Sequence, residues 1–229
     1  MEGARLCGEA AANGVEIVYA FVTVKAEGKY SEEVRAVTAS AHECFEVSAG
    51  AADTVAGTAG PQGIVCVCRM PEPAGSAHLI APGRRCVALD QVQDPANLGA
   101  VIRTAEALGI DAVIVGGGCD VYNPKTLRSA MGSVFRMHIL QTGDLAALLE
   151  QAASAGLGTV ALVTDPSADD IRSVDTGAGF VCVVGNEGAG VGARTLQACR
   201  VKATIPMRGK TESLNAAAAA AIAMWELSK

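Results

Sequence analysis

The sequence predicts an α/β protein in which helices cover both faces of a parallel β-sheet, preceded by a smaller α/β domain. Three observations support this fold class. Of the 229 residues, 50% are hydrophobic and only 18% are charged, which is ample material for a core. After residue 84, short β-branched apolar runs alternate with helical patterns, as in sheets built from strand–helix–strand units. A proline- and glycine-rich stretch, Pro71–Ser76, separates this region from the part before it.

The smaller domain is expected at residues 1–74. Helical patterns cover Ala4–Ala12 and Ser31–Ser40, and β-rich apolar runs cover Val15–Thr23 and Gly63–Arg69. Residues 75–83, which end in Ala-Pro-Gly, are predicted to form a linker. The larger domain then spans residues 84–229.

The larger domain alternates strands and helices along its length. The predicted strands are Cys86–Leu89, Ala112–Val115, Met137–Leu140, Thr159–Thr164, Phe180–Val184 and Val201–Ile205. The predicted helices are Leu98–Leu108, Pro124–Phe135, Leu145–Ala155 and a long alanine-rich helix that starts at Ser213. Asn97 and Asn123 are placed to cap the first two helices, and Gly109 and Gly156 to end the first and third.

Three polar, glycine-containing segments begin at or just after predicted strand ends. They are Asn97–Thr104, Gly185–Gly190 and Ile205–Asn215. In open parallel sheets, ligands bind outside the carboxyl ends of the strands. The sequence therefore predicts one ligand pocket assembled from three distant segments. Within the first of them, Gly99 and Ala100 are expected to leave room for a ligand beside Arg103. Taken alone, this segment is explained at least as well by an amphipathic helix with a solvated arginine.

Two familiar nucleotide-binding motifs fit these segments poorly. A Rossmann site at Gly185–Gly192 would need an acidic residue about twenty positions later, where the chain reads Thr204–Met207. Gly209-Lys210-Thr211 resembles the end of a P-loop, but Thr204 occupies the position of the required earlier glycine. A nucleotide-binding oxidoreductase is therefore disfavoured. What remains is a strand end and a turn whose backbone groups can contact the edge of a purine ring.

Charge and cysteine usage narrow the function classes. The net charge is −6, with 5 Lys/Arg against 10 Asp/Glu in residues 1–83, and 13 against 14 in residues 84–229. The cations of the second part cluster, so a local patch can hold phosphates, although a solvated face explains the clusters equally well. The eight cysteines lack paired spacing and the three histidines lack ligand spacing, so we expect reduced thiols, no metal site and a cytoplasmic protein. The apolar run Ala216–Met224 is too short to span a bilayer, so we expect no membrane partner.

Together, the three segments resemble the SpoU (TrmH-type) branch of the SPOUT methyltransferases in order and spacing. The first family motif, Asn-x-Gly-Ala-x-x-Arg, is matched by Asn97, Gly99, Ala100 and Arg103. The second, Gly-Asn-Glu-Gly-x-Gly, is matched from Gly185 to Gly190. The third is matched by Ile205, Pro206, Met207, Ser213, Leu214 and Asn215. Residues 1–70 more faintly resemble the L30e-like RNA-binding domain of the ribosomal-RNA members.

The resemblance implies methylation of a ribose 2′-hydroxyl in RNA with S-adenosylmethionine as cofactor. It favours ribosomal RNA and leaves transfer RNA open, and it implies a C-terminal trefoil knot and a homodimer whose active site uses residues of both subunits. A catalytically silent RNA-binding protein of the same fold is the alternative. The intact motif residues argue against it, since a decayed site should show losses.

Carried over by position, the resemblance implies roles for individual residues. The cofactor would be held by Gly185, Ile205 and Leu214, with Met207 and Ser213 nearby. Arg103 would be the catalytic residue, in a site shaped by Asn97, Glu187, Ser213 and Asn215. Because an arginine side chain does not lose its proton in proteins, we expect Arg103 to clamp a phosphate and the reacting hydroxyl rather than to act as the base.

Overall fold

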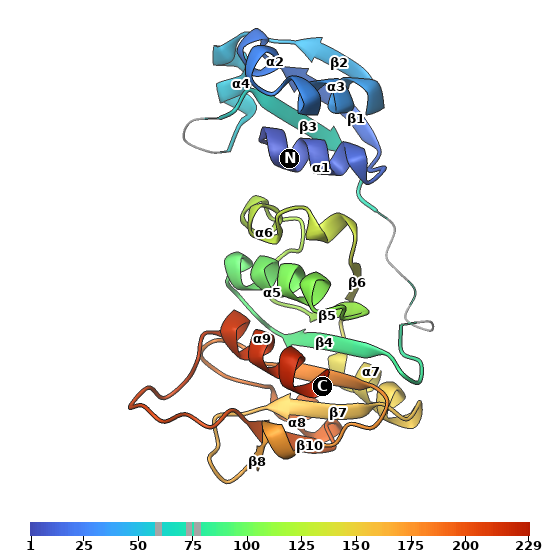
Figure 1. The fold of residues 1–229 in the computed structure, drawn as a ribbon, viewed down its shortest axis with the longest axis vertical. Coiled ribbons are helices and arrows are strands. Elements are labelled where there is room, and N and C mark those ends of the chain that lie inside the picture. The colour runs from blue at the N-terminus through green and yellow to red at the C-terminus, as the bar shows by residue number, and fades with distance from the viewer. Residues whose placement is uncertain (58–60, 72–74, 76–78) are drawn as a thin grey trace. The chain divides into compact units, whose positions relative to one another are not determined.

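The computed structural model describes residues 1–57, 61–71, 75 and 79–229. The chain forms two compact units, Met1–Glu72 and Pro73–Lys229 (Figure 1). Each unit has its own sheet and its own buried core.

The N-terminal unit is a three-stranded sheet with helices. Its strands are β1 (Ile17–Val22), β2 (Ala41–Glu46) and β3 (Ile64–Cys68), in the order β2-β1-β3. Its helices are α1 (Ala4–Ala12), α2 (Val24–Lys29), α3 (Ser31–Ser40) and α4 (Ala49–Val55). Strand β1 runs parallel to β2 and antiparallel to β3. Side chains of α1 and α3, such as Cys7 and Val37, pack on Ile17 and Ile64 to form the core.

The sequence predicted α1, α3, β1 and β3 but not β2, α2 or α4. Strand β2 was missed because its sequence lacks the alternation of a half-buried strand. In the structure, no residue from His42 to Glu46 is buried. It is held instead by its backbone pairing with β1. The two missed helices are short, at six and seven residues.

The second unit contains a seven-stranded sheet in the order β6-β5-β4-β9-β7-β10-β8. The strands are β4 (Arg85–Asp90), β5 (Ala112–Gly116), β6 (His138–Gln141), β7 (Gly158–Leu162), β8 (Asp169–Asp170), β9 (Phe180–Val184) and β10 (Val201–Thr204). Every pair of neighbouring strands is parallel, as predicted. The trefoil knot that the family resemblance implies stays a prediction.

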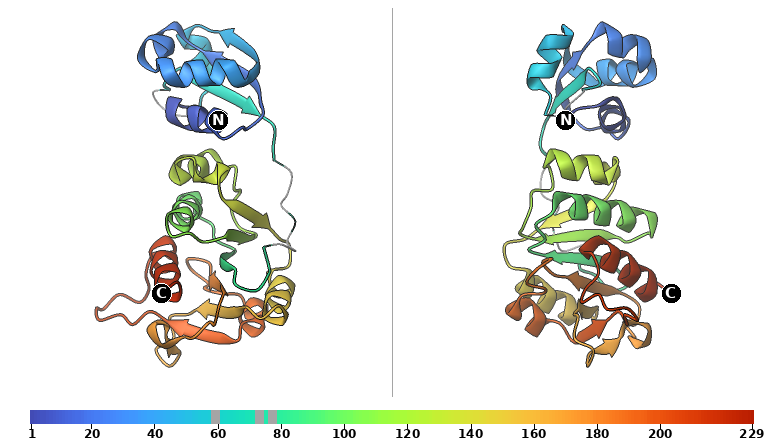
Figure 2. Two further views of the ribbon diagram at one scale, coloured as in Figure 1. Left: turned by 45° about the vertical axis from the view of Figure 1, so that its right-hand side comes forward. Right: turned by 90° about the vertical axis from the view of Figure 1, so that its left-hand side faces the viewer.

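Helices cover both faces of this sheet, also as predicted (Figure 2). They are α5 (Pro95–Ala107), α6 (Pro124–Ala130), α7 (Leu145–Ser154), α8 (Ala193–Ala198) and α9 (Ala216–Leu227), with short 3₁₀ turns at Ser133–Phe135 and Ile171–Ser173. Helices α5 and α9 pack together on one face, and α7 packs with α8 on the other. Leu148 and Leu149 of α7 join the core formed by alternate residues of β4, β5 and β9.

Helix boundaries differ from the prediction at three places. Helix α5 begins at Pro95 and is capped by Asp94, whose carboxylate accepts from the amide of Ala96 at 3.0 Å. Asn97 is therefore not the cap but a buried residue of the first turn, 7% exposed. The predicted helix Pro124–Phe135 is broken after Ala130, because Met131 and Gly132 adopt left-handed conformations with φ of 52° and 87°.

The last helix starts later than expected. Helix α9 begins at Ala216, and Asn215 caps it by accepting from the amides of Ala217 and Ala218 at 3.0 and 3.2 Å. Ser213 thus lies before the helix, in the segment that approaches it. The prediction for Gly99 was also wrong: a Cβ there would lie 2.5 Å from the carbonyl oxygen of Thr126, so this glycine lets α5 approach α6 rather than a ligand.

The range predicted as a linker, residues 75–83, includes residues of the second core. Residues 76–78 of the predicted linker 75–83 lie outside the described residues. Leu79 and Ile80 are buried against the α7 side of the larger sheet. No helix in the described part of the chain is long and apolar enough to cross a membrane.

Candidate active site

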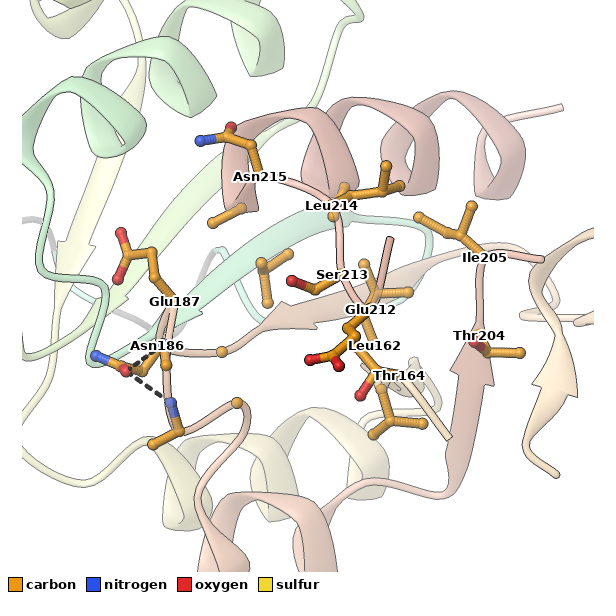
Figure 3. Close-up of a pocket in the computed structure, with 18 of the residues that line it drawn as sticks. Leu162, Thr164, Asn186, Glu187, Thr204, Ile205, Glu212, Ser213, Leu214 and Asn215 are labelled. Carbon is orange, nitrogen blue, oxygen red and sulfur yellow. Dashed lines mark hydrogen bonds between the residues drawn. The ribbon is translucent and has the colours of Figure 1, made fainter. Parts of the chain in front are cut away.

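A cavity of about 540 Å³ lies at the carboxyl ends of β7, β9 and β10 (Figure 3). It is lined by Leu162, Val163, Thr164, Val184, Gly185, Asn186, Glu187, Gly188, Ala189, Gly190, Thr204, Ile205, Met207, Glu212, Ser213, Leu214, Asn215, Ala216 and Ala219. The second and third motif segments thus face each other across one space, at the edge of the sheet where parallel strands offer ligand sites.

The loop after β9 folds back on itself to form one wall. The backbones of Asn186 and Gly190 exchange hydrogen bonds of 3.0 and 2.9 Å. The side-chain oxygen of Asn186 accepts from the amides of Gly188 and Ala189, both at 2.9 Å. A Cβ on Gly185 would lie 2.1 Å from the carbonyl carbon of Gly190, so only glycine permits this tight return.

Glu187 ties this loop to the start of α5. Its carboxylate accepts hydrogen bonds from the amides of Gln93 and Asp94 at 3.1 and 3.2 Å, and from the side chain of Asn97 at 2.8 Å. Partial burial opposes ionisation of Glu187, but the bonds from Asn97 and the two amides outweigh it and lower the pKa of this carboxyl. Glu187 therefore remains a carboxylate at neutral pH.

Asn97 extends this connection to the third segment. While its amide nitrogen donates to Glu187, its side-chain oxygen accepts from the side chain of Asn215 at 2.9 Å. Asn215 also caps α9. One chain of hydrogen bonds thus joins residues 90 and 118 positions apart in the sequence, and it brings all three motif segments together.

The predicted cofactor residues Gly185, Ile205, Met207, Ser213 and Leu214 all line the cavity. Of the predicted catalytic residues, Glu187, Ser213 and Asn215 line it too, and Asn97 lies directly behind two of them.

Arg103 stands apart from this group. It lies six residues beyond Asn97 on α5, about 9 Å along the helix axis, and it is not among the residues that line the cavity. Its side chain is exposed and makes no hydrogen bond or ion pair within the described residues. Its guanidinium is therefore available to a group that approaches from solvent.

Two residues that support the site were not predicted. Asp90, at the end of β4 and 6% exposed, accepts from the amide of Gly192 at 2.8 Å. Gln91 has a left-handed backbone with φ of 57°, and its carbonyl accepts from the side chain of Asn186 at 2.8 Å. Both follow the strand predicted at Cys86–Leu89, and the rule that ligand loops follow parallel strands was the signal that could have found them.

The cavity offers polar and apolar groups to an organic ligand. Within the described ranges, no group of three or more His, Cys, Asp or Glu side chains is placed to hold a metal ion. The apolar walls and the exposed backbone of the loops suit a ligand with both a hydrophobic part and hydrogen-bonding edges.

Comparison with known sequences places these features in a family. Residues 84–225 match the model of the SpoU rRNA Methylase family, and residues 1–74 match a model described as RNA 2′-O ribose methyltransferase substrate binding. The 23S rRNA (guanosine(2553)-2′-O)-methyltransferase RlmP of Bacillus subtilis is 38% identical over 186 residues, which cover 81% of this chain and 72% of that protein. The 23S rRNA (uridine(2479)-2′-O)-methyltransferase of Streptomyces viridochromogenes is 33% identical over 171 residues, which cover 72% of this chain and 60% of that protein.

Two solved structures of similar fold are also named as methyltransferases. An AdoMet-bound rRNA methyltransferase from Sinorhizobium meliloti superimposes with a TM-score of 0.84 at 28% identity, covering 99% of this chain and 85% of the other. The SpoU methyltransferase AviRb from Streptomyces viridochromogenes, in complex with AdoMet, has a TM-score of 0.84 at 26% identity, covering 100% and 88%. Since the family model spans more than half of the chain and includes all three segments that meet around the cavity, the protein belongs to the SpoU rRNA methylase family.

Proposed function

We propose that this protein transfers the methyl group of S-adenosylmethionine to a ribose 2′-hydroxyl of ribosomal RNA. The observation that carries the proposal is the cavity built from three distant segments, in a chain whose relatives are named as 23S rRNA 2′-O-methyltransferases. Two solved proteins of the same fold hold AdoMet. Because these relatives are enzymes, a catalytically silent binding protein is the weaker interpretation.

The cavity fits the cofactor in size and chemistry. Its volume of about 540 Å³ lies within the range of about 300–1,000 Å³ that is usual for small-molecule sites. Leu162, Val184, Ile205 and Leu214 provide apolar walls. The close return at Gly185 brings backbone groups to the surface of the cavity, where they can contact the cofactor.

When bound, S-adenosylmethionine supplies a methyl group on a positively charged sulfur, which is already a good electrophile. The residues of the chain then have to align the hydroxyl and assist loss of its proton. Hydrogen bonds among Asn97, Glu187 and Asn215 fix the two cavity walls relative to each other. Walls fixed in this way can align the hydroxyl with the methyl group, and alignment of reactants lowers a barrier by up to about 7–11 kcal/mol in the best cases. Arg103 clamps the RNA phosphate and stabilises the developing negative oxygen.

The proposed substrate accounts for the N-terminal unit. Residues 1–74 match a model for RNA substrate binding, so this unit holds the ribosomal RNA while the larger unit performs the transfer. Because the acceptor is a 2′-hydroxyl, DNA is not a substrate. Some relatives are named as tRNA/rRNA methyltransferases, which keeps transfer RNA as the second substrate class. An RNA substrate of either kind favours a cytoplasmic enzyme.

We also propose that the enzyme works as a homodimer through α9. Within the described part of the second unit, the exposed large hydrophobic side chains are Met207, Leu214, Ile222 and Trp225, and the last two are 38% and 59% exposed on one side of α9. Such an apolar surface is typical of a protein interface. Helix α9 packs beside α5, so a second copy bound there brings its own Arg103 toward this cavity.

Incubation with methyl-labelled S-adenosylmethionine and, in separate reactions, unmodified 23S rRNA, transfer RNA or the corresponding DNA, followed by digestion to nucleosides, tests the proposed reaction. We expect a labelled 2′-O-methyl nucleoside and no labelling of the corresponding DNA. Label on a base would contradict the ribose chemistry. Label in transfer RNA alone would move the substrate to the second class.

Substitution of Arg103 by alanine tests its role in the same assay. We expect turnover to fall by about 10²-fold or more, because the clamp on the reacting oxygen is lost. Cofactor affinity should change little, because the proposed partners of Arg103 are the RNA phosphate and the reacting oxygen rather than the cofactor. Arg194→Ala, which removes another exposed arginine of the same unit, is the control. Near-normal turnover in Arg103→Ala would remove this residue from the mechanism.

Trp225→Glu tests the dimer. A carboxylate in the middle of an apolar interface must be desolvated without a partner, so sedimentation should show a monomer where the unchanged protein is a dimer. Turnover should fall with it. Val24→Glu, at an exposed apolar position of the N-terminal unit, should leave the dimer intact. A Trp225→Glu protein that sediments like the unchanged one would exclude α9 as the interface.

A further inference from the structure

Among the described residues, the walls of the cavity carry negative charge that no basic side chain offsets. Two of the lining residues that the structure describes are ionisable, Glu187 and Glu212, and none is a lysine, arginine or histidine. The cavity is thus lined by one sign of charge.

The two carboxylates differ in how they are held. Glu187 accepts from two backbone amides and one side-chain amide, and these are neutral donors that leave its charge in place. Glu212 belongs to the segment that leads into α9, and it makes no hydrogen bond or ion pair within the described residues. Figure 3 shows its carboxylate turned into the cavity, on the side lined by Leu162 and Thr164.

The surroundings strengthen the effect of these charges on a bound ligand. Leu162, Val184 and Ile205 form apolar walls of low dielectric constant, while Leu214 and Glu212 are themselves partly open to solvent. Clefts lined by one sign of charge and enclosed by such walls focus the field and concentrate ligands of the opposite sign. The cavity therefore favours a cationic ligand over a neutral one of the same shape.

We infer that Glu212 makes this cavity select S-adenosylmethionine over its demethylated product, S-adenosylhomocysteine. The inference rests on the proposed function. The two molecules share their adenosine, carboxylate and ammonium groups and differ at the sulfur, which is a cationic sulfonium in one and a neutral thioether in the other. Glu212 is therefore a specificity residue that favours the ligand with a charged sulfur over the ligand with a neutral one.

This selection has a consequence for turnover. In the reaction the carbon–sulfur bond breaks, sulfur keeps the electron pair, the methyl group bonds to the 2′-oxygen and the hydroxyl proton is released. The sulfur becomes neutral at that moment, so its attraction to Glu212 disappears. Glu212 thus holds the substrate form of the cofactor and eases departure of the product form.

Calorimetric titration of the complete protein with each molecule tests the inference without relying on activity. The unchanged protein should bind S-adenosylmethionine more tightly than S-adenosylhomocysteine. In Glu212→Gln, which keeps the shape and removes the charge, affinity for S-adenosylmethionine should fall by about 3- to 10-fold, as expected for one partly solvated charge pair. Affinity for S-adenosylhomocysteine should stay within about twofold.

Two further measurements sharpen the test. Sinefungin, in which a charged amine replaces the sulfonium methyl, should lose affinity for Glu212→Gln as S-adenosylmethionine does. Glu150→Gln removes one exposed carboxylate of α7 that does not line the cavity, so it should leave all three affinities unchanged. An equal melting temperature for the two variants shows that Glu212→Gln is folded.

The outcomes separate this inference from the proposed function. Equal weakening of S-adenosylmethionine and S-adenosylhomocysteine in Glu212→Gln would place the carboxylate at their shared ammonium group and overturn the selection. No change in either affinity would overturn it as well. Failure of the unchanged protein to bind either molecule would overturn the proposed function itself.

Discussion

The site depends on the Glu187 carboxylate, which accepts three hydrogen bonds. The donors are the amides of Gln93 and Asp94 and the side chain of Asn97, all at the start of α5. The two amides belong to the N-cap residue of α5 and the residue before it, so the carboxylate lies at the helix end that carries partial positive charge. Bonds to a charged group contribute about 1.5–3 kcal/mol each, so this contact fixes the loop after β9 against the helix after β4.

The sheet brings the two loops of this contact to the same edge. Close approaches between backbone segments then fix the positions of these loops. Strands β4 and β9 are neighbours in parallel register, so their carboxyl ends deliver the two loops to the same edge. Gly185 then allows the second loop to fold back, and Gly118 lies where a Cβ would be 2.1 Å from the carbonyl oxygen of Val92. Asn97 carries the connection on to Asn215 and so fixes the entry of α9.

The sequence predicted the parallel sheet and the meeting of the three segments because both follow from local patterns. Buried strands such as Phe180–Val184 appear as apolar β-branched runs, and polar glycine loops follow them. The start of α5 was misplaced because Asn97 is itself a good capping residue. Asp94 caps the helix instead, since Pro95 is preorganised for the first helical position.

Other features depend on contacts that no local pattern encodes. Strand β2 is held by its pairing with β1. The break at Met131 depends on a left-handed turn, for which Gly132 was the one signal in the sequence. The separation of Arg103 from the cavity depends on where α5 lies beside the sheet, and the inward direction of Glu212 depends on the path of the exposed segment before α9. The motif match assigned Arg103 to the site without showing that it lies outside the cavity, and it did not single out Glu212, which lines the cavity.

The central claim is that the chain of bonds Glu187–Asn97–Asn215 builds the cofactor cavity, and Asn97→Ala tests it most directly. Asn97 does not line the cavity, so any effect on ligand binding must act through the two residues that it joins. Calorimetric titration with S-adenosylmethionine should show affinity lowered by about tenfold or more, as expected when both part-buried hydrogen bonds of Asn97 are lost. Affinity equal to that of the unchanged protein would contradict the account.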